Sequence, residues 1–207
     1  MPSEVVDLIP ELAARNTTIT NLSNKTLAVI GSRANIATGN LIYMLGGIDL
    51  QTLKELHKKS IDSYEEAVQE LKDTNKELYF YTPRYRVTIK DQTPSADGLL
   101  LVVRPPLQAA DASFTKDLVD KVKSSESFFI KRKAIILIEA PANHGWSESE
   151  YNDLARSIKA TLQSLSISAK SVPLIPSDLH GENFIELSPK TPWYNNVTLV
   201  TTLDEIL

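Results

Sequence analysis

The sequence predicts an α/β fold in which a mixed, mostly parallel sheet carries helices on both faces. Three observations lead to this fold class: short continuous apolar runs, amphipathic helical patterns between them, and one segment typical of a β-hairpin. Short apolar runs suit strands buried on both faces, as in a parallel sheet that helices cover. An ordinary share of charged residues, 23%, fits a globular domain of this class.

The predicted strands alternate with predicted helices along the chain. The apolar runs lie at 27–30, 99–103, 134–138 and 172–175. Residues 50–76 are rich in Leu, Lys and Glu and are expected to form one or two exposed helices. A further helix is expected after the N-cap candidate Ser113, where apolar residues repeat at helical spacing.

The clearest helix signal begins at Ser147. Ser147 and Glu150 form a capping box, in which each residue satisfies a backbone N–H of the first turn. Apolar residues then recur on one face of the predicted helix: Tyr151, Leu154, Ala155, Ile158, Leu162 and Leu165. A hairpin is expected earlier, where 77–81 and 85–90 flank Thr82-Pro83-Arg84.

Two regions are expected: an N-terminal extension at residues 1–24, with a short helix at 5–14, and one domain at residues 25–207. The net charge of −4 gives no global attraction to nucleic acid or to an anionic membrane. No apolar run reaches the 18 residues of a membrane span, and the acidic, proline-containing N-terminus is not typical of a signal peptide. A cytoplasmic protein with no membrane or strong nucleic-acid contact is therefore expected.

Catalytic chemistry based on cysteine or on a metal cluster finds no support in the sequence. The chain has no cysteine, which excludes disulfides, thiol catalysis and cysteine-bound metals. The three histidines lie in unrelated segments and indicate neither a metal site nor a catalytic triad. No cofactor is expected.

Several segments, in the same order along the chain, resemble the GTP-binding domain of eukaryotic elongation factor 1-alpha, of the EF-Tu class. They are 28–31, 38–43, 46–49, 82–91, 95–97, the stretch from Trp146 through the capped helix, 171–176, 181–183, 192–194 and 202–206. The resemblance covers about residues 25–207 and implies a three-layer fold like that of P-loop GTPases. It implies a nucleotide site near Gly31, Arg33, Thr38, Asp91 and Ser177.

The sequence departs from the family at each part of that site. A phosphate loop needs Gly-x-x-x-x-Gly-Lys-Ser/Thr, whose backbone N–H groups surround phosphate and whose lysine reaches the outer phosphates. The segment Gly31 to Thr38 is shorter and has no second glycine and no lysine, although Arg33 and the Thr38 hydroxyl remain. The guanine motif Asn-Lys-x-Asp is replaced by residues 139–142, Glu-Ala-Pro-Ala, and only Ser177 keeps its character in the second guanine segment.

The segment after Asp91 lacks the glycine, the histidine and the helix of the family's second switch. Residues 92–97 are too few for a helical crossover, which usually needs a dozen residues or more. Loss of this helix is expected to expose part of one sheet face. The N-terminal extension, a partner protein or inward-shifted helices could cover that face.

These departures predict a pseudo-GTPase that is not an enzyme, with no catalytic residue and no metal site. The predicted function is a constitutive protein-binding module related to translation, with the ribosome or translation factors as possible partners. Two alternatives stay open: a scaffold subunit of a complex unrelated to translation, and an unconventional nucleotide-binding switch built from Arg33, Thr38, Asp91 and Ser177.

Overall fold

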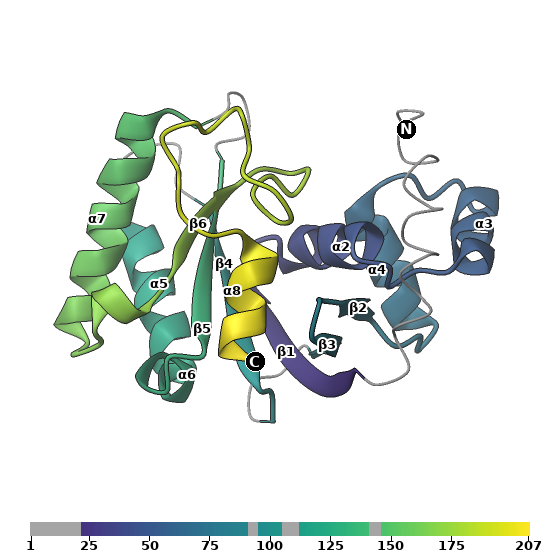
Figure 1. Cartoon of the computed structure of the whole chain (residues 1–207), viewed down its shortest axis with the longest axis horizontal. Coiled ribbons are helices and arrows are strands. Elements are labelled where there is room, and N and C mark those ends of the chain that lie inside the picture. The colour runs from purple at the N-terminus through teal and green to yellow at the C-terminus, as the bar shows by residue number, and fades with distance from the viewer. Residues whose placement is uncertain (1–21, 91–94, 105–111, 141–145) are drawn as a thin grey trace.

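The computed structural model describes residues 22–90, 95–104, 112–140 and 146–207 (Figure 1). Their strands form one six-stranded sheet in the order β2-β3-β1-β4-β5-β6. The strands are β1 (Ser23–Gly31), β2 (Tyr79–Tyr81), β3 (Tyr85–Lys90), β4 (Gly98–Val103), β5 (Ala134–Glu139) and β6 (Leu174–Ser177). Only β2 and β3 pair antiparallel, and the other neighbours are parallel. The predicted mixed, mostly parallel sheet is therefore confirmed.

The helices of the described residues pack around the sheet, and α2 contacts the central strands β1 and β4. Figure 1 shows α2, α3 and α4 at one end, α5, α6 and α7 at the other, and α8 in front of the sheet between them. Their bounds are α2 Ala34–Met44, α3 Leu50–Lys58, α4 Tyr64–Asp73, α5 Ala112–Ser124, α6 Glu126–Ile130, α7 Glu148–Ser164 and α8 Leu199–Ile206. None of the helices in the described part of the chain is long and apolar enough to cross a membrane.

The apolar runs at 27–30, 99–103 and 134–138 lie in the interior strands β1, β4 and β5, and the run at 172–175 leads into the edge strand β6. Every residue of β4 and of β5 is buried, so both faces of these strands are covered. Residues 50–76, which were expected to form one or two helices, form α3 and α4. The capping box of α7 is formed as predicted, with the Ser147 side chain accepting from the N–H of Glu150 and the Glu150 side chain accepting in return.

Some element boundaries differ from the predictions. β6 begins at Leu174, because residues Ala169–Ser171 form a 3-10 turn and the strand takes up its pairing with β5 only at Leu174. The short helix α6 was not predicted; its Phe128 and Phe129 are buried in the core. The predicted helix at 5–14 lies outside the described residues, and the proposed boundary between an extension and a domain stays a prediction.

The strand register separates the residues of β1 and β3 into two faces of the sheet. Side chains alternate along a strand, and paired residues share a face. Leu27 pairs with Gly98, where an added Cβ would lie 2.7 Å from Leu207, so the end of α8 packs on this face. The opposite face is called the Thr26 face here, and β1 and β3 give it Asn24, Thr26, Ala28, Ile30, Arg86, Thr88 and Lys90.

The connection from β3 to β4 passes across β1, and the two strand ends that it joins lie less than one strand length apart. β3 ends at Lys90, level with Ala28, while β4 starts at Gly98, level with Leu27. The two strand ends are therefore about 10 Å apart, two strand spacings, and no long diagonal is needed. The described residues of this connection, 95–97, are not helical, as the missing second-switch helix predicts.

The end of this connection is fixed to β1 by a group of hydrogen bonds. The backbone N–H and the hydroxyl of Thr26 both donate to Asp97 Oδ2, each at 2.9 Å. The N–H of Asp97 donates to the carbonyl of Thr26 at 2.9 Å. Burial raises the pKa of Asp97, but the bonds from Thr26 and the charges of Lys25 and Lys133 outweigh it, so that the pKa is lowered. The carboxylate therefore stays ionised in this position.

Candidate functional site

The carboxyl ends of the parallel strands β1, β4, β5 and β6 meet at one edge of the sheet. Ligands of open α/β sheets bind outside this edge. Gly31 ends β1, Glu139 ends β5 and Ser177 ends β6, while Arg33 and Arg104 follow β1 and β4. The fold therefore brings the predicted positions Gly31, Arg33 and Ser177 to the same edge of the sheet.

The turn from β1 to α2 contains only two residues, Ser32 and Arg33. Gly31 has φ +114°, and a Cβ added to it would lie 2.0 Å from the carbonyl oxygen of Val102. The N–H of Ser32 donates to that same carbonyl at 3.1 Å. This turn therefore packs directly against β4, where a phosphate loop would instead arch over a ligand.

Arg33 closes the turn in a left-handed conformation, with φ 58°, and directly precedes α2. Its carbonyl accepts the N–H of Ile36 at 2.9 Å. Left-handed backbone is uncommon outside glycine. The two-residue turn imposes this backbone conformation on Arg33. The shortened loop therefore also determines the direction in which the Arg33 side chain leaves the backbone.

Thr38 is buried within α2. α2 begins at Ala34, so Thr38 lies in the second turn of the helix, and it is 2% exposed. A hydroxyl that holds magnesium beside a phosphate loop must instead lie open to the ligand. The Thr38 hydroxyl is thus not open to a ligand, and the predicted grouping of Thr38 with Arg33 and Ser177 in one site stays a prediction.

Ser177 is fully buried and bonds to its own chain. Its hydroxyl donates to the carbonyl of Asp178 at 3.3 Å, and its carbonyl accepts the indole N–H of Trp146 at 2.9 Å. Asp91, the remaining predicted position, lies outside the described residues. Within the described chain, no group of three or more His, Asp or Glu side chains could hold a metal ion.

Glu139 also lies at this edge of the sheet, although the sequence did not predict it as a site residue. Its side chain is 1% exposed, and its Oε2 has no hydrogen-bond partner among the described residues. Burial raises the pKa of Glu139 to about 7, although Arg33 and Arg104 act to lower it. The signal in the sequence was a charged residue at the end of the apolar run 134–138.

The edge therefore holds one buried carboxyl group under the influence of two arginines. Glu65 and Asp178 raise the pKa of Glu139 further, so negative charge is close by as well. An anion at this edge would be attracted by the arginines and repelled by the nearby carboxyl groups. In the β1–α2 turn, the N–H of Ser32 is already bonded to the Val102 carbonyl and is therefore not free to bind a phosphate.

Comparison with known proteins identifies elongation factor 1-alpha as a relative. The protein of that name from Plasmodium falciparum (isolate K1 / Thailand) is 31% identical over 86% of this chain and 47% of its own length. The one from Coccidioides immitis (strain RS) is 28% identical over 81% of this chain and 44% of its own length. This chain thus spans about half the length of the curated relatives it matches. No protein-family model matches it.

A solved structure supports the fold. Sup35 complexed with GMPPNP matches with a TM-score of 0.68 at 19% identity, over 89% of this chain and 45% of Sup35. At this identity the match shows the fold alone. The expected three-layer fold of P-loop GTPases is therefore confirmed.

The prediction that the chain is not an enzyme is contradicted. Elongation factor 1-alpha is a GTPase, Sup35 carries a GTP analogue in its structure, and nothing in these similarities shows a loss of catalysis. The altered loops at Gly31 and after Ile138 misled the prediction, because a departure from a motif was read as loss of the activity. The predicted relationship itself is confirmed: the chain is an EF-Tu-like G domain, homologous to the GTP-binding domain of elongation factor 1-alpha.

Proposed function

We propose that this translation GTPase-like domain acts in the cytoplasm as a constitutive protein-binding module, with a partner from the translation machinery. Constitutive means that the affinity for the partner is the same with GTP, with GDP and without nucleotide. The relationship to elongation factor 1-alpha supports the context of translation. The altered phosphate loop and the altered second-switch segment after Asp91 support the independence from nucleotide.

One observation carries this function: the β1–α2 turn bonds to the protein itself. The Ser32 N–H donates to the Val102 carbonyl, and Gly31 lies against the same group. A nucleotide-controlled partner site needs a γ-phosphate contact that moves a switch. Here the turn is closed and the β3–β4 connection is fixed at Asp97 to β1, so the partner surface keeps one shape.

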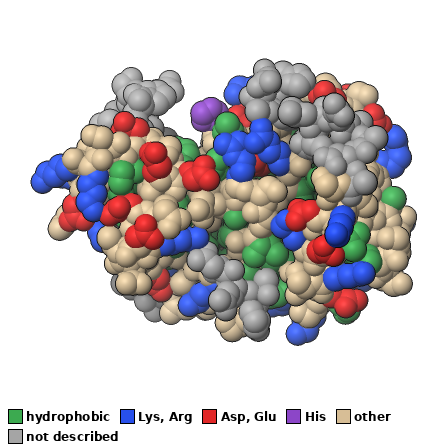
Figure 2. Space-filling view, turned by 180° about the vertical axis from the view of Figure 1, so that it is seen from behind, with side chains coloured by type: hydrophobic (Ala, Val, Ile, Leu, Met, Phe, Trp, Pro, Cys, Tyr) green, Lys and Arg blue, Asp and Glu red, His purple; other side chains and the backbone are tan. Residues whose placement is uncertain are grey.

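The Thr26 face is the proposed contact surface. Asn24 and Lys90 are exposed on it, and Ile30 is half-buried. Figure 2 views the molecule from the side opposite α8 and shows charged side chains of both signs around hydrophobic ones. Lys90 has no ion pair with any described residue, whereas Arg86 pairs with Glu77 at 2.5 Å. An acidic surface on the partner is the complement of this arrangement.

A retention experiment tests the proposal. The tagged chain is incubated with cytoplasmic extract under four conditions, with GTP, GDP, GMPPNP or no nucleotide, each with magnesium, and the retained proteins are identified. The same translation proteins are expected in equal amounts under all four conditions. Lys90→Glu is expected to reduce their retention, while Lys54→Glu on the exposed side of α3 leaves it unchanged.

Two results contradict the proposal. Retention that requires one nucleotide would identify a switch, and equal retention by both charge-reversal variants would exclude the Thr26 face. A GTPase assay on the same preparation reports hydrolysis separately, so the binding result does not depend on catalysis.

A further inference from the structure

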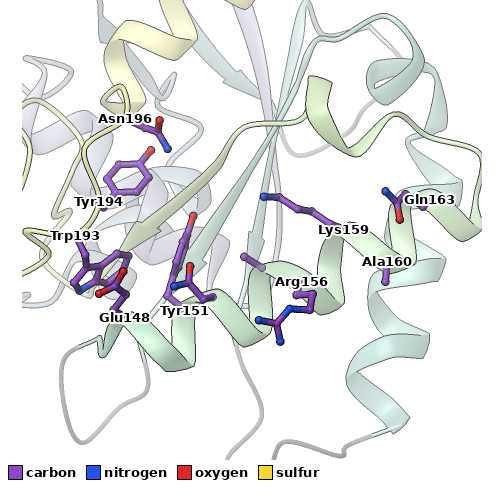
Figure 3. Close-up of a pocket in the computed structure, with 11 residues that line it drawn as sticks. Glu148, Tyr151, Arg156, Lys159, Ala160, Gln163, Trp193, Tyr194 and Asn196 are labelled. Carbon is purple, nitrogen blue, oxygen red and sulfur yellow. The ribbon is translucent and has the colours of Figure 1, made fainter.

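A groove of about 650 Å³ lies between α7 and the loop that leads to α8 (Figure 3). The groove lies at the other end of the molecule from β2 and β3 (Figure 1). A volume of this size falls within the range of ligand pockets.

The floor of the groove is a rigid group of aromatic rings. Tyr151 packs at 4.9 Å from Trp193 and at 6.3 Å from Tyr194, measured between ring centroids. The Tyr151 hydroxyl donates to the Leu174 carbonyl at 2.9 Å, and the Tyr194 hydroxyl donates to the Val197 carbonyl at 3.0 Å. Both tyrosine rings are thus held in place before any ligand arrives, while Trp193 is only half-buried.

The rim of the groove carries polar groups that the protein itself does not use. Among the described residues, none forms a hydrogen bond or an ion pair with the side chains of Asn152, Lys159, Gln163 and Asn196, which all line the groove. Arg156, by contrast, pairs with Asp153 at 2.9 Å. Figure 3 shows Lys159 reaching from α7 toward the side where Tyr151 and Tyr194 lie.

The chemistry of this rim matches an extended peptide. Side-chain amides both donate and accept, as main-chain peptide groups do, and a lysine without an ion pair suits a carboxylate. The half-buried indole of Trp193 offers apolar contact at the opposite end. Glu148 lies at that same end and disfavours a second acidic residue there.

The length of the groove sets the length of the peptide. Lining residues run along α7 from Glu148 to Gln163, which corresponds to about 22 Å of helix. An extended chain of about seven residues covers that distance. Tyr151 and Lys159 are about 12 Å apart along the helix, so an apolar and an acidic peptide residue would stand three or four positions apart.

We propose that this groove binds an extended segment of a partner protein, with an acidic side chain on Lys159 and an apolar side chain on Trp193. The inference deepens the proposed protein-binding function, because it names a second surface and the chemistry of its ligand. The experiment measures peptide binding to the groove and involves neither the Thr26 face nor any nucleotide. The groove proposal and the proposed function can therefore fail separately.

Fluorescence polarisation with labelled seven-residue peptide pools tests the groove on the whole chain. The pools mix serine, glycine, leucine and phenylalanine at six positions, with glutamate fixed at the central position or lysine fixed there as the matched pool. Binding is expected for the glutamate pool only. Lys159→Ala is expected to weaken it by about two- to fivefold, as for loss of one solvent-exposed ion pair.

The control variant Lys54→Ala removes the same charge from α3 and is expected to bind like the unchanged chain. Trp193→Phe keeps an aromatic ring and is expected to weaken binding less than Trp193→Ala, and circular dichroism checks that each variant is folded. Equal binding of the two pools, no binding of either, or unchanged affinity of Lys159→Ala overturns the proposal.

Discussion

Gly31 ends β1 at a position where any side chain would collide with the backbone of β4. The Val102 carbonyl lies 2.0 Å from an added Cβ, and φ is +114°. Both facts follow from the two-residue turn into α2. The sequence reveals the glycine and the short loop, but it does not reveal which carbonyl lies against them, because that depends on the pairing of β1 with β4.

Replacement of Gly31 by alanine is expected to lower the free energy of unfolding by about 3 kcal/mol or more, since strain and a backbone clash add. Urea unfolding measures the change. Gly46→Ala is the matched control: it also has positive φ, +75°, but its nearest Cβ contact is 3.6 Å. That variant is expected to lose only about 1 kcal/mol. Equal losses in the two variants would contradict the close approach at Val102.

Glu139 gives the domain a stability that depends on pH. Burial raises its pKa to about 7 in the folded chain, above the value of about 4.3 in an unfolded chain. The folded state therefore binds the proton more tightly, and its stabilisation is complete at acidic pH and is lost as the pH rises through about 7. The carboxyl groups of Glu77 and Asp97 have lowered pKa values and act at more acidic pH.

Between pH 5 and 7, the unchanged chain is expected to lose up to about 1.4 kcal/mol of unfolding free energy per pH unit relative to Glu139→Gln. Urea unfolding of both proteins across this range gives the difference directly. A difference that stays constant, or that changes in the opposite direction, would show that Glu139 is ionised in the folded chain at these pH values.

Among the elements, the β3–β4 connection departs most from what the family resemblance implies. The short segment after Asp91 could be read from the sequence, and so could the non-helical course of its described residues, 95–97. The distance that it crosses could not, because the register of β3 and β4 against β1 decides it. The polar residues Arg86, Thr88 and Lys90 of β3 also reduce the apolar area that was expected to need a cover.

Removal of the Asp97 side chain is expected to free this connection. Asp97→Ala leaves the N–H and the hydroxyl of Thr26 without their shared acceptor, and we expect a loss of about 1 to 3 kcal/mol of unfolding free energy. Asp62→Ala, in an exposed turn, is the control and is expected to change stability by no more than about 0.5 kcal/mol. Hydrogen exchange at Thr26 adds a local measure, and protection unchanged in Asp97→Ala would contradict the role of this carboxylate.

Elements with strong local signals were predicted well. The capping box of α7, the β2–β3 hairpin and the buried strands β4 and β5 depend on short-range patterns, which the sequence displays directly. Helix α6 and the start of β6 depend on packing and on pairing with distant strands, and the sequence alone missed them. The candidate site divides in the same way: the sequence pointed to Gly31, Arg33 and Ser177, which lie at the carboxyl edge of the sheet, while the burial of Thr38 and the position of Glu139 required the fold.

At the scale of the whole molecule, the fold and the relationship to elongation factor 1-alpha agree. The order of similar segments predicted the family, and identity over most of this chain confirms it. The activity could not be predicted in the same way. Motif residues define chemistry only together with their geometry, and the chain corresponds to about half of each relative.

The proposed independence from nucleotide is tested most directly by thermal unfolding with GTP, GDP or GMPPNP and magnesium. Because the β1–α2 turn is bonded to Val102, we expect the same midpoint of unfolding with and without each nucleotide. A nucleotide present at 100 times its dissociation constant would add about 2.7 kcal/mol, which raises the midpoint by about 5 to 10 °C for a chain of this size. A rise of that kind, specific for guanine nucleotides, would show that nucleotide still binds and would contradict the closed β1–α2 turn on which the proposed independence rests.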